Sequence, residues 1–294
     1  MNYVLENEFI RVEINPLGAE VSSIKSKKSG IEYLWQGDTE FWKNRATLIF
    51  PICGRIFDGY YTYKGNRYEM PLHGFAKISL FSVKEESDTH INLVLNSNEE
   101  TRAMYPFDFN LTISYILEGY TLRTKFTVNN ENEELLPFSL GGHPGFNVPF
   151  KSEESFEDYY IEFACEKEVS RVEMVGGVFY SGKDAPYELE EGKIIKLSHE
   201  LFDNDAIFLN NTCNTVYLKS RKNKNMLKMV FNDMKHLGFW HTPLKKAPFV
   251  CIEPWNGIPS YHGKVDDFST KNEMIQLRKG KTYSTFFDIS IIEW

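Results

Sequence analysis

The sequence lacks the segments and motifs on which several large classes of protein depend. No apolar run approaches the length of a membrane span, and the N-terminus has no basic stretch followed by an apolar one, so we expect neither a membrane anchor nor a signal peptide. A Gly-x-Gly-x-x-Gly motif, a phosphate-binding loop and a Gly-x-Ser-x-Gly motif are also missing. Their absence argues against a nucleotide cofactor and against serine-hydrolase chemistry.

Cysteine is scarce and widely spaced. The four cysteines form no Cys-x-x-Cys pair, so we predict neither a disulfide framework nor a zinc site, and expect small buried hydrophobic residues. His-x-His and His-Glu-x-x-His motifs are missing too, and the sequence therefore does not require a metal. These cysteines are Cys53, Cys165, Cys213 and Cys251.

Basic residues are outnumbered. The 33 Lys and Arg against 41 Asp and Glu give a net charge of −8, which argues against nucleic acid as a general partner because phosphate binding needs a basic field. This balance suits a cytoplasmic protein that handles a neutral small molecule. A phosphorylated substrate stays open, since one local Arg or Lys cluster is enough to bind it.

Alternation of apolar and polar residues dominates what is present. It is clearest over 107–117 and 122–128, which a Glu-Gly-Tyr turn separates, and it indicates half-buried antiparallel strands. Helical periodicity is confined to 39–43 and 98–104, and no linker divides the chain. We therefore predict an all-β protein, a single large antiparallel β-sandwich over 1–294. Further strands are expected at 10–14, 91–95, 159–164, 215–219, 226–231, 237–240, 249–253 and 285–292.

A glycine-rich segment at 140–146 surrounds His143, which precedes Pro144. The proline favours an extended backbone at the histidine, and the glycines let a ligand or another chain segment approach closely. His143 is therefore a candidate catalytic group. The alternative is a histidine at a strand end that bonds a neighbouring carbonyl.

Glu253 ends an apolar run at 249–253 and also precedes a proline. We expect these apolar neighbours to desolvate the carboxylate and raise its pKa, which is how a general base is tuned toward neutral pH. The alternative is a buried salt bridge, or a glutamate that faces solvent at a strand end.

A third group consists of His73, in Pro-Leu-His-Gly-Phe, and Arg55, in Cys-Gly-Arg-Ile. A histidine followed by glycine suits a tight loop beside a pocket, and a guanidinium offers a planar fork of donors to hydroxyl or carboxylate oxygens. Taken singly, each is equally explained by loop packing or by a structural ion pair.

Together these segments resemble the aldose 1-epimerase (galactose mutarotase) family, and within it the LacX-like branch. The opening at 9–21 is also similar to the first strands of that family, so the resemblance spans essentially the whole chain. It rests on the order of four motifs: Gly54-Arg55-Ile56, His73-Gly74-Phe75, Gly141-Gly142-His143-Pro144-Gly145-Phe146 and Glu253-Pro254-Trp255-Asn256-Gly257.

The resemblance implies a galactose mutarotase-like supersandwich with an open cleft for a pyranose, and an isomerase that interconverts its α and β anomers. It implies Glu253 as general base, starting ionised, and His143 as general acid, starting protonated. It implies that His73, Arg55 and Asp205 bind substrate hydroxyls, with Asp203 as the alternative to Asp205. No cofactor or metal is needed for this chemistry. We expect one of three aromatic residues to stack on the sugar: Phe75, Trp240 or Trp255.

Two other functions stay open. A hexose-6-phosphate 1-epimerase would use the same acid–base pair and would need a basic cluster, for which Lys77, Arg45 or Lys245–Lys246 are candidates. A non-catalytic sugar-binding or sensing protein would keep His73 and Arg55 but would not need both His143 and Glu253. The sequence does not distinguish a monomer from a homodimer.

Overall fold

The longest alternating segment of the sequence forms the central hairpin of the largest sheet. In the computed structural model, which describes residues 2–294, β9 and β10 pair antiparallel with Leu117 opposite Leu122 and Ile113 opposite Phe126. All four side chains are buried. The periodicity of two thus places one face of each strand in the core, as the sequence predicted.

This hairpin belongs to a nine-stranded sheet in which every neighbouring pair is antiparallel. In spatial order its strands are β16 (Ile194–Lys196), β13 (Tyr159–Phe163), β18 (Thr215–Ser220), β19 (Met226–Phe231), β23 (Thr282–Ile292), β10 (Thr121–Asn130), β9 (Phe109–Glu118), β8 (His90–Asn96) and β7 (Ser82–Glu86).

A seven-stranded antiparallel sheet contains the segments rich in glycine and proline. In spatial order its strands are β15 (Phe179–Tyr187), β14 (Val169–Val175), β17 (Ile207–Asn210), β20 (His236–Trp240), β21 (Phe249–Trp255), β12 (Gly141–Asn147) and β4 (Ala46–Ile49).

The other elements are short. A three-stranded sheet and two two-stranded sheets contain β1 (Tyr3–Glu6), β2 (Ile10–Asn15), β3 (Glu20–Ser26), β5 (Tyr60–Tyr63), β6 (Asn66–Glu69), β11 (Leu136–Phe138) and β22 (Ile275–Leu277). The helices are α1 (Glu99–Met104) and the 3-10 turns η1 (Phe57–Gly59), η2 (Ala76–Ile78), η3 (Phe156–Asp158) and η4 (His199–Phe202).

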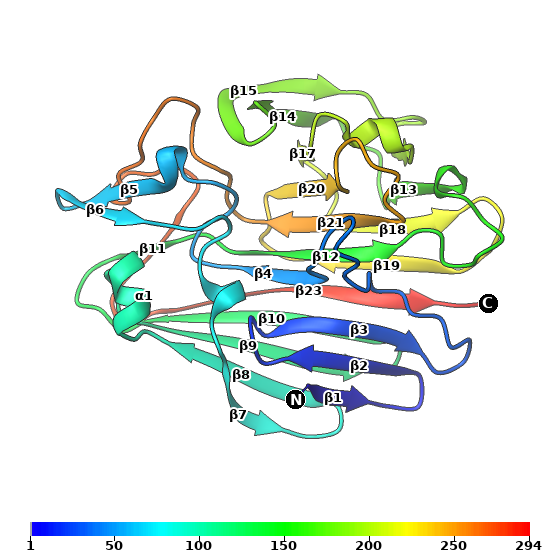
Figure 1. Ribbon diagram of the computed structural model, residues 1–294, viewed down its shortest axis with the longest axis horizontal. Helices are drawn as coiled ribbons and strands as arrows, with labels where there is room; N and C mark the ends of the chain where they lie inside the picture. Colours follow the sequence, from blue (N-terminus) through cyan, green and yellow to red (C-terminus); the bar gives the residue numbers. More distant parts are fainter. Residues whose placement is uncertain (1) are drawn as a thin grey trace.

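The sheets form a sandwich. The three-stranded and seven-stranded sheets meet where β3 contacts β4, and both pack on one face of the nine-stranded sheet. In Figure 1 the blue β1–β3 lie over β8–β10, and the hydroxyl of Tyr115 on β9 donates to the carbonyl of Ala19 beside β3. Phe163 of β13 meets Phe239 of β20 across the other half of the core. The predicted antiparallel β-sandwich is confirmed.

A glycine allows the two large sheets to approach closely at one point. A Cβ added at Gly142 on β12 would lie 2.5 Å from the ring of Phe287 on β23. Because side chains alternate along a strand, Gly142 faces the core, and its neighbour His143 faces outward. The outer face of the seven-stranded sheet is therefore where the candidate residues lie.

The two helical expectations have different outcomes. Helix α1 forms where it was predicted, with Asn98 as its N-cap accepting from the amide of Thr101. The segment 39–43 forms only a turn, closed by the amide of Trp42 donating to the carbonyl of Asp38.

The prediction of no disulfide is wrong for one pair of cysteines. Cys165 is joined to Cys213, whereas Cys53 and Cys251 are free and buried as expected. The pairing follows from the sheet, because β13 and β18 are neighbours and the amide of Ala164 donates to the carbonyl of Thr215. Spacing along the chain does not reveal this proximity.

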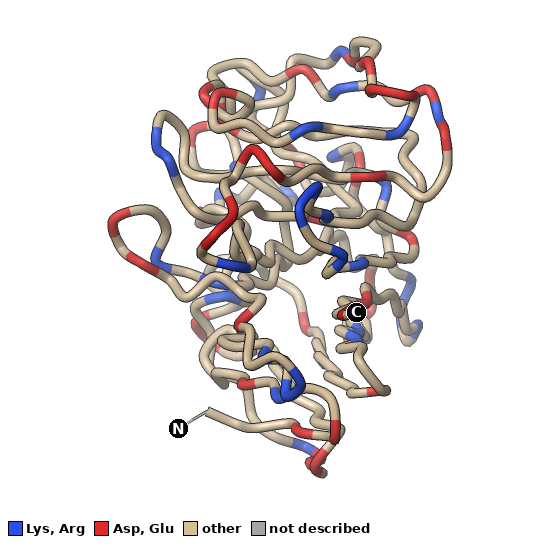
Figure 2. The backbone as a smooth tube through the Cα atoms, turned by 90° about the vertical axis from the view of Figure 1, so that its right-hand side faces the viewer, with Lys and Arg blue, Asp and Glu red and all other residues tan. Residues whose placement is uncertain are grey.

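Charges of both signs are interspersed along the backbone in Figure 2, without a continuous basic tract. Over residues 2–294, every helix is too short or too polar to cross a membrane.

Candidate active site

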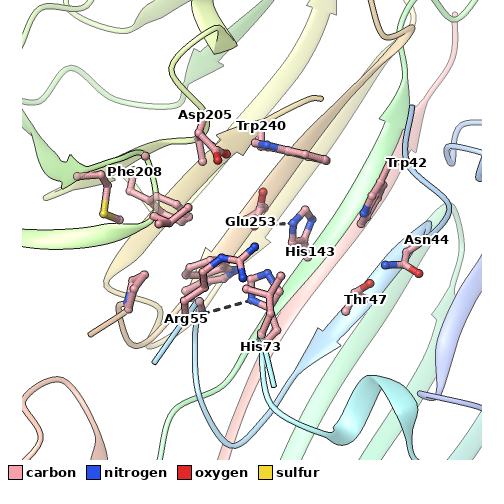
Figure 3. Close-up of a pocket in the computed structure, with 18 of the residues that line it drawn as sticks. Trp42, Asn44, Thr47, Arg55, His73, His143, Asp205, Phe208, Trp240 and Glu253 are labelled. Carbon is pink, nitrogen blue, oxygen red and sulfur yellow. Dashed lines mark hydrogen bonds and ion pairs between the residues drawn. The ribbon is translucent and has the colours of Figure 1, made fainter. Parts of the chain in front are cut away.

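A pocket on the outer face of the seven-stranded sheet brings together all five residues predicted from the sequence. Its cavity is about 300 Å³, at the lower end of the range for small-molecule sites, and Figure 3 shows the side chains around it. The lining includes Arg55, His73, His143, Asp205 and Glu253. Segments that are distant in the sequence thus meet over one sheet.

The register of two strands brings His143 and Glu253 together. On the paired strands β12 and β21, Gly141 is opposite Trp255 and Gly145 is opposite Cys251, so the residues midway between them face each other. The Nε2 atom of His143 lies 3.3 Å from Oε2 of Glu253. An acid and a base at this separation can both reach one substrate group.

Both members of this pair are held away from water. Glu253 is 1% exposed and His143 is 8% exposed. Both carboxyl oxygens of Glu253 and the Nδ1 atom of His143 have no hydrogen-bond partner among the described residues. Buried polar atoms are normally satisfied, so this cluster of unsatisfied atoms favours a binding or catalytic use over a structural one.

Burial decides the protonation of the pair. It raises the pKa of Glu253 well above its usual range, and the charge of Asp205 adds to the effect. Burial lowers the pKa of His143 to about 3, with Lys77 contributing. Both shifts favour the neutral forms of the two groups before substrate binds. They oppose the expected ionised Glu253 and protonated His143 in the unliganded protein, because two charges are costly in a desolvated site.

His73 is fixed by its backbone and by one hydrogen bond. It has φ +62°, and the adjacent Gly74 also has a positive φ. A Cβ at Gly74 would lie 2.1 Å from the carbonyl oxygen of Phe50, so only glycine fits there. The Nδ1 atom of His73 accepts from the amide of Gly54 at 3.2 Å, and burial holds its pKa well below the usual value. Neutral His73 therefore presents an Nε2–H donor.

Asp205 and Arg55 lie at the edges of the pocket. Asp205 has φ +73°, and its Oδ1 atom accepts from the amide of Ala206. Asp203 is exposed and lines a neighbouring hollow with Asp205, outside the pocket that contains Glu253. Of the two aspartates, Asp205 is therefore the one placed to meet a ligand beside Glu253. Arg55 is exposed on the loop that follows β4.

Aromatic rings enclose His143 on several sides. Trp42 stacks on its imidazole at 4.8 Å between centroids, and Trp240 approaches edge-on at 5.6 Å. Trp240 and Trp255 line the pocket as expected. Phe75 does not, because it is fully buried in the core, which leaves Trp240 and Trp255 of the three alternatives. Trp42 was not identified from the sequence, where it stands outside the glycine-rich and histidine-containing segments.

Three buried groups of the site also have atoms suited to a metal. The ligand atoms of His143, Cys251 and Glu253 all lie within 4.8 Å of one another. Burial, and next the charge of Glu253, raise the pKa of the Cys251 thiol well above its usual value, which opposes the thiolate that a metal requires. A metal here would occupy the same nitrogen and oxygen atoms that proton transfer needs, so the two uses exclude each other.

The pocket can be compared with those of known proteins through the sequence and the fold. The profile of the aldose 1-epimerase family matches residues 1–290. The chain belongs to the aldose 1-epimerase family. Protein LacX of Lactococcus lactis subsp. lactis, in its plasmid and chromosomal forms, is 32% identical over 305 residues, which cover 99% of this chain and 100% of LacX. The resemblance drawn from the four motifs is confirmed.

Solved structures of aldose 1-epimerase relatives share the fold. A galactose mutarotase related enzyme from Lactobacillus acidophilus has 34% sequence identity and a TM-score of 0.95, and the match covers 100% of this chain and 98% of that one. A galactose mutarotase-like protein from Lactobacillus casei has 29% identity and a TM-score of 0.94, over 99% and 100% of the two chains. The galactose mutarotase-like fold is thus shown, in a family that binds aldose sugars.

Proposed function

We propose that this chain is an isomerase that interconverts the α and β anomers of an aldose, with Glu253 and His143 as its acid–base pair. The observation that carries the proposal is the buried contact of 3.3 Å between two titratable groups that lack other hydrogen-bond partners. Perturbed titratable groups that converge in a cleft are typical of catalytic sites. Family membership supports the same reaction class.

The reaction needs two proton transfers at one centre. In our proposal Glu253 takes the proton of the anomeric hydroxyl while His143 gives a proton to the ring oxygen, so that the bond from the anomeric carbon to the ring oxygen breaks and an aldehyde forms. Rotation about the bond to the next carbon exposes the other face. The two groups then exchange roles as the ring closes, and the pair regains its starting protons.

The unliganded protonation state is compatible with these roles. The pair has one transferable proton in two arrangements. Either Glu253 and His143 are both neutral, or Glu253 is ionised and His143 is protonated. Moving that proton across the 3.3 Å contact therefore converts the state that burial favours into the state that starts the reaction. We propose that sugar hydroxyls stabilise the second state by hydrogen bonding to the charged groups.

The surrounding side chains suit the recognition of a polyol. The Nε2–H of His73 and the guanidinium of Arg55 offer donors to hydroxyl oxygens, and the carboxylate of Asp205 offers acceptors. The rings of Trp42 and Trp240 provide flat apolar surfaces for the C–H face of a pyranose. These assignments need no covalent intermediate and no cofactor.

The direct test follows the optical rotation of freshly dissolved α-glucose or α-galactose. We expect Glu253→Gln and His143→Asn each to lower the accelerated rate by about 100-fold to 10,000-fold, the usual contribution of a general acid or base. Matched controls are Glu118→Gln and His90→Asn, which change the same residue types on the nine-stranded sheet and should keep the wild-type rate.

Two outcomes would overturn the proposal. Wild-type rates in both site variants would remove the acid–base assignment. Binding of a sugar to the wild-type protein, with no change in the exchange between its anomers by NMR saturation transfer, would assign a sugar-binding or sensing role instead.

A further inference from the structure

The pocket contains cations that no carboxylate of the protein neutralises. Lys77 on η2 and Arg55 both line it. Neither forms an ion pair within the described part of the chain. Many surface lysines are paired, as Lys64 is with Glu134 and Lys222 with Asp158. What sets Lys77 and Arg55 apart is their place, because both line the candidate active site, where a ligand can reach them.

The order of strands places Lys77 at one end of the pocket. Within the seven-stranded sheet, β17 is followed by β20, β21, β12 and the edge strand β4. Asp205 lies two residues before β17, whereas η2, which bears Lys77, contacts β4. Glu253 on β21 and His143 on β12 lie between the two ends. A sugar held over the central pair thus meets an acidic group on one side and a basic group on the other.

Burial and neighbouring positive charges both act on Lys77. Lys77 is half-buried, and its pKa is lowered first by burial and next by the charges of Lys43 and Arg55. Glu20 opposes that shift, but its carboxylate already accepts from the amides of Arg45 and Ala46. Clustered cations repel one another, so an anion bound among them relieves a cost that the free protein carries.

The other candidates for a basic cluster lie elsewhere. The Arg45 guanidinium lies against Gly37, and Lys245 and Lys246 are exposed on the loop after β20. None of the three lines the pocket. The cluster that the sequence left open is therefore built from Lys77 and Arg55.

We propose that the substrate is an aldose carrying an anionic group, a phosphate or a carboxylate, which Lys77 and Arg55 bind at the β4 end of the pocket. The inference rests on the proposed function and specifies its substrate class. Arg55 provides a planar fork that matches either oxyanion, and Lys77 provides a compact positive charge. The net charge of −8 disfavours anions at long range, so this local pair has to select them.

The test compares glucose with glucose 6-phosphate and glucuronate, which share the anomeric centre. Anomer exchange is measured by NMR and corrected for each uncatalysed rate. We expect kcat/KM to be at least about tenfold higher for one or both anionic sugars, the scale of a hydrogen bond to a charged group. This preference should decrease as salt is added, because salt screens exposed charge. A preference for only one of the anionic sugars identifies the oxyanion.

Lys77→Gln should lower kcat/KM for the preferred anionic sugar about tenfold to a hundredfold more than for glucose. The control Lys84→Gln removes the same charge from exposed β7 on the nine-stranded sheet and should change neither value. Equal effects of Lys77→Gln on charged and neutral sugars, or faster turnover of glucose by the wild type, overturn this inference and leave the isomerase proposal standing. No acceleration with any of the three sugars overturns the isomerase proposal itself.

Discussion

The two large sheets of this molecule are built on the same antiparallel plan but bury their residues differently. In the nine-stranded sheet, β9 alternates strictly between buried and partly exposed residues. In the seven-stranded sheet, all seven residues of β21 are buried, and so are six of the seven in β12. One sheet therefore has a solvated outer face, whereas the centre of the other is covered on both faces.

The covering of the second sheet is what creates the site. Loops before β17, after β4 and around η2 lie over its outer face and enclose the pocket. Charged groups on the two sheets differ accordingly. On the nine-stranded sheet Arg123 makes two hydrogen bonds of 2.8 Å to the carboxylate of Asp288. The buried His143–Glu253 pair is unsatisfied. Regular strands whose charged groups are hydrogen-bonded stabilise the fold, whereas the candidate site lies where buried polar groups lack such partners.

The largest expected effect comes from replacing one buried side chain on each large sheet, which tests whether stability and activity depend on different sheets. Leu111→Ala on β9 and Ile252→Ala on β21 each remove a fully buried side chain and should each cost about 2–5 kcal/mol of unfolding free energy. Ile252→Ala should also lower the proposed isomerase rate of the folded protein, because Ile252 adjoins Glu253 on β21 and small displacements of the proposed base are costly. Urea unfolding and polarimetry measure the two effects. Equal rates in both variants would contradict the assignment of activity to the seven-stranded sheet alone.

A smaller effect is expected where the two sheets touch. In Gly142→Ala the new Cβ meets the ring of Phe287, and overpacking of this kind costs about 1–3 kcal/mol. Phe287→Leu in the same chain should recover part of that loss, since the smaller side chain vacates the contact. Thermal unfolding of the two single variants and the double variant measures the coupling. If the stability lost in the double variant equals the sum of the two single losses, the close approach does not contribute to stability.

The smallest effect for each step of the measurement is a change of stability with pH. Because the folded pKa of Glu253 is raised, the unfolded chain loses this proton at a lower pH than the folded chain. Stability should therefore fall as pH rises above about 4.5, by at most about 1.4 kcal/mol per pH unit. The folded pKa of His143 is about 3, so its contribution is lost as pH falls from about 6.5 toward 3.

Glu253→Gln isolates the first of these slopes. Above about pH 6.5, where His143 is neutral in both states, the variant should gain stability relative to the wild type as pH rises. Glu118→Gln on the nine-stranded sheet provides the control for loss of one exposed carboxylate. Parallel pH profiles for the wild type and Glu253→Gln would contradict the buried, neutral carboxyl.

How much of each strand the sequence predicts depends on how regularly its residues alternate. The strands of the nine-stranded sheet at 159–164, 215–219 and 226–231 were predicted nearly to their ends, because alternation is a local signal. Strands β14 and β15 and the hairpin β5–β6 were not predicted. They are irregular or mostly exposed, and their pairing depends on neighbours that are distant along the chain.

By itself the sequence determined the antiparallel β class, the family, and the segments in which the site residues lie, because periodicity, turns and motifs are local properties of the chain. Only the tertiary structure decided what those residues become. The register of β12 against β21 sets the 3.3 Å contact, and desolvation raises the pKa of Glu253. The packing of η2 on β4 brings Lys77 into the pocket, and the pairing of β13 with β18 joins Cys165 to Cys213. Each of these depends on distances between distant segments, which only the folded chain fixes.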